Sequence, residues 1–170
     1  RRLLGLINQL LELSKFDSGK IKLQAVRQDI VPFLKGVLYS FDSLARQQEI
    51  ELEFQTGAGS ITLYYDPEKL EEVIANLLSN AVKFTPRQGK ITLAVDLDAA
   101  PPGTNETNGT NGINGPGWVQ ITVTDTGPGI PPGQLEHIFD RFYQAESTLE
   151  YHRKGTGIGL AIAKEIIELH

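Results

Sequence analysis

Hydrophobic residues recur along this chain with two periods, one typical of helices and the other of strands. After Asp29, as far as Gln47, and again after Asp66 and Pro67, apolar side chains stand three or four positions apart, which predicts two amphipathic helices. Aspartate is a residue type that caps the start of a helix well. Four shorter segments alternate between apolar and polar residues and therefore predict strands: 50–54, 61–65, 90–97 and 119–125.

Helices and strands thus follow one another in mixed order, which predicts the α/β (α+β) class. We expect a two-layer α/β sandwich, in which a mixed sheet is covered by helices on one face. Residues 1–16 show a further helical pattern with a wide apolar stripe, so this helix either packs on its own domain or joins a helical bundle or dimer interface. Residues 99–117 have almost no apolar side chains and predict a flexible insertion between two strands.

Composition narrows the classes of function. The 170 residues, 40% of them hydrophobic, are enough for one domain with an appendage. The absence of cysteine excludes disulfides and thiolate metal sites and fits a reducing compartment, so we expect a cytoplasmic protein. The net charge of -5 argues against a nucleic-acid partner. Because the chain opens with Arg1 rather than methionine, we expect it to be a piece of a longer protein.

Three polar residues lie in the helix that follows Asp66. At about 100° per residue, Asn76, Asn80 and Lys83 form one stripe beside an apolar face centred on Leu77. The other members of that predicted face are Leu70, Val73, Ile74, Ala81 and Phe84. The stripe is either a solvated flank or a binding site. An amide oxygen can bind a hard cation and a lysine can hold a phosphate, so the second alternative predicts an ionic ligand.

Two glycine clusters complement this stripe. DTGPGI, residues 125–130, follows a predicted strand, so the Asp125 carboxylate either makes an ordinary turn or accepts a hydrogen bond from an exocyclic amine such as that of adenine. GTGIGLAIAKEIIELH, residues 155–170, runs from a glycine loop into a helix whose first N–H groups suit a phosphate. It is not a Rossmann fingerprint, because no strand precedes it, and not a P-loop, because no Gly-Lys-Ser/Thr follows.

In this order and spacing, the chain resembles the catalytic ATP-binding domain of sensor histidine kinases of two-component systems. That domain belongs to the superfamily of gyrase, heat-shock-90, histidine kinase and MutL ATPases, which implies a Bergerat-type ATP-binding fold. NLLSNAVKFTP resembles the N box, DTGPGI the G1 box, IFDRFYQ the F box and GTGIGLAIAKEIIELH the G2 box. The resemblance implies a division into 1–22, the second helix of the dimerisation and phosphotransfer hairpin with its linker, and 23–170, the catalytic ATP-binding domain.

The resemblance also implies roles for individual residues. Asn80 would coordinate Mg²⁺ between the phosphates with help from Asn76, and Lys83 would contact phosphate, so these three are the expected catalytic residues. Asp125 would bind the adenine amine. A lid would extend over about 131–154. The remaining expected nucleotide-binding residues are Phe84, Gly127, Gly129, Ile130, Gly155, Thr156, Gly157, Gly159 and Leu160.

The implied activity is transfer of the ATP γ-phosphoryl group to a histidine on a dimerisation helix absent from this chain. The phosphoryl group would then pass to the receiver domain of a response regulator. The full-length protein would form a homodimer through its dimerisation helices, and this chain would belong to the cytoplasmic part of a membrane-anchored sensor. The alternatives are a nucleotide-sensing module without catalysis and a hydrolysing ATPase of the same superfamily, although hydrolysing relatives carry glutamate where this chain has Asn76.

The chain departs from the family pattern at three points. Gln144 stands where many relatives carry arginine, which puts one phosphate contact in doubt. None of His137, His152 and His170 is followed by the acidic residue that accompanies a phosphoaccepting histidine, so we expect no autophosphorylation of this chain. The chain also ends at His170, where relatives continue into a glycine turn and closing strands.

Overall fold

The computed structural model describes residues 21–98, 118–144 and 155–170. The predicted helix at 1–16, the predicted insertion at 99–117 and residues 145–154 of the predicted lid lie outside these ranges, so the predicted boundary between 22 and 23 stays a prediction. In the described part, no helix is long and apolar enough to cross a membrane. Its elements are β1 Val26–Asp29, α2 Ile30–Ser40, α3 Asp42–Gln47, β2 Glu51–Thr56, β3 Thr62–Tyr65, α4 Pro67–Phe84, β4 Lys90–Asp98, β5 Trp118–Asp125, η1 Pro132–Gln134 and α5 Gly159–Leu169.

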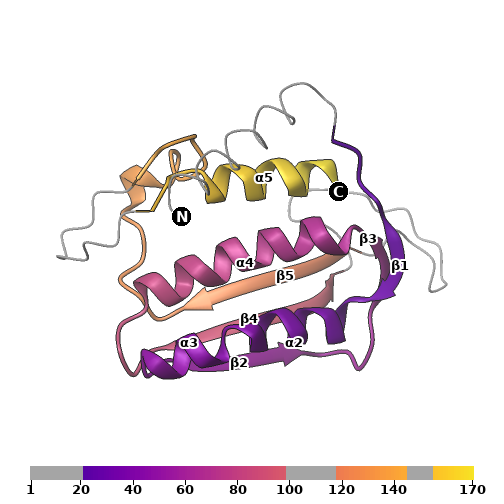
Figure 1. Cartoon of the computed structure of the whole chain (residues 1–170), viewed down its shortest axis with the longest axis horizontal. Coiled ribbons are helices and arrows are strands. Elements are labelled where there is room, and N and C mark those ends of the chain that lie inside the picture. Colours follow the sequence, from indigo (N-terminus) through magenta and orange to yellow (C-terminus); the bar gives the residue numbers. More distant parts are fainter. Residues whose placement is uncertain (1–20, 99–117, 145–154) are drawn as a thin grey trace.

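The main sheet has the strand order β2-β4-β5, with β2 and β4 parallel and β4 and β5 antiparallel. A separate two-stranded sheet pairs β1 with β3. Figure 1 shows α2 and α4 side by side along one face of the main sheet, with α5 lying along α4. The α/β (α+β) class and the two-layer sandwich with a mixed sheet covered on one face are therefore confirmed.

Asp29 begins α2, as its side chain predicts. Its carboxylate accepts hydrogen bonds from the Ser60 hydroxyl at 2.8 Å and from the N–H groups of Ile61 and Val31 at 3.1 and 3.0 Å. These donors, the Ser60 hydroxyl foremost, lower the pKa of Asp29. The single helix predicted to reach Gln47 is divided at Phe41 into α2 and α3.

Asp66 begins α4 and also joins three parts of the chain. Its carboxylate accepts hydrogen bonds from the N–H groups of Gln24 at 2.7 Å and of Lys69 at 3.1 Å, while its own N–H donates to Nε2 of His170 at 3.1 Å. Burial by itself would raise the pKa of Asp66, but the N–H donors outweigh burial and lower the pKa. The start of α4, the segment before β1 and the end of α5 are thus connected at one residue, through the carboxylate and the backbone N–H of Asp66.

The apolar face predicted for α4 is partly wrong. The helix packs on two partners, so its buried residues cover a wider arc than a face centred on Leu77. Leu78 and Val82 are buried in the main core against the sheet, whereas Val73 packs with Ile158, Ile162, Ala163 and Ile166 of the α5 region. Leu77 is only partly buried against that second cluster. Phe84 is 38% exposed, and its ring lies 4.5 Å from the Lys83 ammonium.

Candidate functional site

The polar stripe of α4 lies against the glycine loop that leads into α5. Asn76, Asn80 and Lys83 are half-buried there. A methyl group added at Gly159, the first residue of α5, would lie 3.0 Å from Oδ1 of Asn76. A methyl group at Gly155 would lie 3.3 Å from Nζ of Lys83. Two segments about 80 residues apart in sequence therefore meet along this stripe, as a shared site requires.

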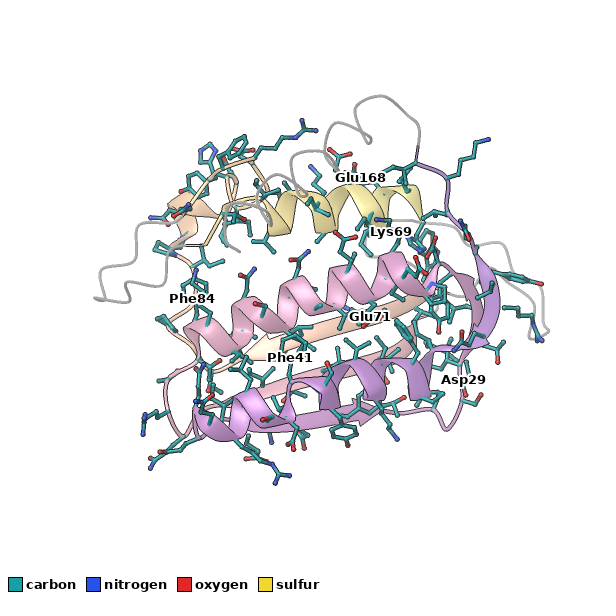
Figure 2. All side chains as sticks on the ribbon, viewed as in Figure 1. Asp29, Phe41, Lys69, Glu71, Phe84 and Glu168 are labelled. Atoms are coloured by element: carbon teal, nitrogen blue, oxygen red, sulfur yellow. The ribbon has the colours of Figure 1, made fainter. Side chains whose placement is uncertain are left out.

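Asp125 lies at the end of β5, beside the C-terminal end of α4. Its Oδ1 accepts a hydrogen bond from the Gly127 N–H at 2.8 Å, and the residue is exposed, so the carboxylate is accessible to a ligand. Gly127 lies so close to α4 that an added methyl group would be 3.0 Å from the Phe84 carbonyl oxygen. Figure 2 shows Phe84 at the end of α4 opposite Lys69, which places Asp125 and Gly127 near the same end as Lys83.

The turn after Gly127 is held by backbone geometry. Gly129 has a φ of +71°, a left-handed conformation that glycine adopts without strain, although an added methyl group there would meet no atom. Ile130, which follows it, is 42% exposed. Both residues are exposed and follow Asp125 closely in sequence.

The glycine loop, residues 155–159, is held by hydrogen bonds from residues 142 and 144. The Phe142 N–H donates to the Gly157 carbonyl at 2.7 Å, and Nε2 of Gln144 donates to the Gly155 carbonyl at 3.2 Å. Gly157 has a φ of +71°, and a methyl group on it would lie 2.6 Å from the Phe142 carbonyl carbon, so no other residue fits without backbone movement. At the C-terminal end of the loop, Ile158 is completely buried.

Thr156 lies in this loop and Leu160 follows it, and no described hydrogen bond joins either residue to α4. Thr156 Oγ1 accepts a weak 3.4 Å hydrogen bond from the Ile158 N–H, which shapes the loop locally. Leu160 is half-buried in the first turn of α5. The expected site residues thus form two groups, one along the α4 stripe with Gly155 and Gly159, and the other around Asp125 at the end of α4.

Two contacts near the loop were not predicted from the sequence. The hydrogen bond of Gln144 to Gly155 has no signal in the residue pattern, because it joins two ends of a segment whose path the pattern does not predict. The second is the approach of His137 to Asp140, with Nδ1 of the imidazole 2.9 Å from Oδ2 of the carboxylate. The acidic partner follows three positions later, so a search of the next residue does not find it.

Magnesium fits the amide oxygens of this stripe. In the described ranges, no group of three His, Asp or Glu side chains is arranged to hold a metal ion, so an all-carboxylate site has no basis there. Mg²⁺ usually keeps several waters and takes only one or two protein oxygens together with substrate phosphates. Asn76 and Asn80 stand at i and i+4 on one face of α4 and can supply such oxygens.

Comparison with known proteins gives a consistent result. Residues 65–170 match the family described as histidine kinase-, DNA gyrase B-, and HSP90-like ATPase. The chain is 36% identical over 171 residues to histidine kinase P4 of Formosa agariphila, and the aligned region covers 99% of this chain and 11% of that protein. It is 32% identical over 169 residues to sensor histidine kinase WalK of Bacillus subtilis, and here the aligned region covers 99% of this chain and 25% of that protein.

A solved structure agrees with these relatives. The crystal structure of full-length ShkA in complex with AMPPNP has a TM-score of 0.76 and 28% identity, over 98% of this chain and 31% of that chain. This chain spans a quarter or less of the length of the two curated relatives above.

Proposed function

This chain belongs to the family of histidine kinase-, DNA gyrase B- and HSP90-like ATPases, and we propose that it is the ATP-binding catalytic domain of a sensor histidine kinase. The observation that carries the proposal is the meeting of the α4 stripe with the glycine loop, at Asn76 with Gly159 and at Lys83 with Gly155. Similarity to two named histidine kinases and to a structure solved with AMPPNP, an ATP analogue, supports it.

In this proposal the two groups of residues bind opposite parts of ATP. The Asp125 carboxylate accepts a hydrogen bond from the adenine amine, while Gly127 leaves room for the base beside the end of α4. Lys83 attracts the phosphates as a point charge. Asn76 and Asn80 hold Mg²⁺, which when bound offsets the negative charge of the phosphates.

The residues of α4 also favour transfer of the γ-phosphoryl group to a side chain over hydrolysis of ATP. Hydrolysing relatives activate water with a glutamate at the position of Asn76, and an amide cannot act as that base. We therefore propose that the γ-phosphoryl group passes to a histidine on the dimerisation helix of the full-length protein, with this domain holding the phosphate in line. The receiver domain of a response regulator is the proposed next acceptor. A homodimer and a cytoplasmic position below a membrane-anchored sensor belong to the same proposal.

Calorimetry with Mg-ATP tests the adenine assignment. Asp125→Asn keeps the shape of the side chain but removes its charge, and a hydrogen bond to a charged group contributes about 1.5–3 kcal/mol. We therefore expect ATP affinity to fall by about 10- to 150-fold. Asp96→Asn is a matched control, because Asp96 also accepts a glycine N–H, from Gly57 at 3.0 Å, but lies at the far end of β4. Equal affinities of Asp125→Asn and the unaltered chain would reject the assignment.

A further inference from the structure

The stretch 142–144 and the stretch 155–157 lie side by side and are joined by two hydrogen bonds. We call this pairing the neck. One bond is between backbones, from the Phe142 N–H to the Gly157 carbonyl at 2.7 Å. The other uses a side chain, Nε2 of Gln144, which donates to the Gly155 carbonyl at 3.2 Å. The position of Gly155 in the neck therefore depends on a side chain that can be changed without altering the backbone bond.

Gly155 is also the point where the loop meets Lys83, since a methyl group added there would lie 3.3 Å from Nζ. The Lys83 ammonium also lies 4.5 Å from the centre of the Phe84 ring. A shift of Gly155 would change the space around the Lys83 ammonium. In the proposed function this ammonium binds phosphate. The base, by contrast, is assigned to Asp125 and to Gly127, which lies close to the Phe84 backbone and donates to the Asp125 carboxylate.

We propose that Gln144 is a positioning residue, which holds Gly155 beside Lys83 and thereby sets the preference of the site for nucleotides with more phosphate charge. The inference rests on the proposed function and adds a determinant of phosphate selectivity to it. Gln144 acts as a neutral donor: it orients the loop by its amide N–H groups and does not contribute a charge of its own. In this proposal Gln144 acts on phosphate indirectly, through Gly155, and makes no direct phosphate contact.

The test compares ATP, ADP and adenosine, each with Mg²⁺, in calorimetric titrations of the same chain. Gln144→Ala removes a single neutral hydrogen bond, so we expect ATP affinity to fall by about three- to tenfold, ADP affinity by less, and adenosine affinity not at all. Gln144→Glu preserves size but can only accept, so it should weaken ATP binding more than Gln144→Ala does. Gln120→Ala, on the exposed side of β5, controls for loss of a glutamine elsewhere.

Thermal unfolding of each variant separates positioning from folding. We expect melting temperatures close to that of the unaltered chain, because Gln144 is exposed and the backbone bond of the neck remains. An equal loss of affinity for all three ligands, or no loss for ATP, would overturn the role of Gln144 while leaving the proposed function intact. Failure of the unaltered chain to bind any of the three ligands would overturn both.

Discussion

Replacing Gly159 by alanine should separate the stability of this domain from its nucleotide affinity. Gly159 is the first residue of α5, and it is not among the glycines with positive φ, so alanine suits its backbone. The new methyl group would lie 3.0 Å from Oδ1 and 3.4 Å from Cγ of Asn76. Such a distance is tighter than ordinary packing, and the neighbour with freedom to move is the Asn76 side chain. Its amide oxygen, which the proposed function assigns to Mg²⁺, would be displaced from its position beside the start of α5.

The magnitudes follow from these two effects. Alanine in place of glycine in a helix stabilises by roughly 0.5–1 kcal/mol. Rotating Asn76 away from its preferred rotamer costs about 0.5–1.5 kcal/mol. The free energy of unfolding should therefore change by less than about 1 kcal/mol. Loss of one polar contact to the bound ligand, about 1–1.4 kcal/mol, should lower Mg-ATP affinity roughly five- to tenfold.

The assay is a double-mutant cycle that combines Gly159→Ala with Asn76→Ala. Calorimetry gives the Mg-ATP affinity of each variant, and urea unfolding gives its stability. In the Asn76→Ala background, Gly159→Ala should have no further effect on affinity, because the displaced amide is already absent. Gly36→Ala is the matched control: Gly36 is exposed within α2, where a methyl group meets no atom, so stability should rise by about 0.5–1 kcal/mol and affinity should not change.

One result would refute this reasoning. If Gly159→Ala weakened Mg-ATP binding by the same factor with and without Asn76, the loss would come from the loop backbone itself. The contact between Asn76 and Gly159 would then have no part in ligand binding.

Three further outcomes are expected. Release of phosphate from ATP by this chain should stay far below about 1 per second, the slow end of typical enzymes, because Asn76 cannot activate water; a phosphate-release assay near that rate would favour a hydrolase. After incubation with γ-labelled ATP the chain should carry no acid-labile phosphate, because phosphoryl transfer needs an acceptor in line with the γ-phosphate. Although Asp140 orients His137, an acid-labile label that disappears in the His137→Asn variant would contradict this expectation. Folding lowers the pKa of Asp66, so the contribution of this carboxylate to the free energy of unfolding should be complete above the unfolded pKa of about 3.9. It should be lost as the pH falls through the lower pKa of the folded state. Urea unfolding of Asp66→Asn should lack that part of the pH dependence.

Local chemistry made much of the fold predictable from sequence. Asp29 and Asp66 cap α2 and α4 as expected, because capping needs only a carboxylate and N–H groups a few residues away. β2, β3, β4 and β5 follow the alternation of apolar residues closely, whereas β1, Val26–Asp29, was not predicted. The break between α2 and α3 at Phe41 was not predicted, since the apolar pattern continues across it. Phe84 was misplaced because the arc that α4 buries depends on α5, which is remote in sequence.

The site was predictable in its residue types but not in its contacts. The residue pattern and the family resemblance together singled out the asparagines, Lys83 and Asp125. The approach of Asn76 to Gly159 and the bond from Gln144 to Gly155 depend on how α5 docks on α4 and on how the chain turns before it. Neither is determined by neighbours in sequence, so neither leaves a periodic signal.

The packing of α5 has a consequence for the local opening equilibria of the domain. Its cluster is small, with Val73, Ile158, Ile162, Ala163 and Ile166 buried apart from the main core. The helix can therefore detach with a lower free energy than global unfolding, and its amides should exchange with solvent hydrogen sooner than those of α4. Detachment would carry Gly155 and Gly159 away from α4. A nucleotide bound to both would oppose it, and at a ligand concentration of about 100 times Kd the amides of α5 would gain about 2.7 kcal/mol of protection.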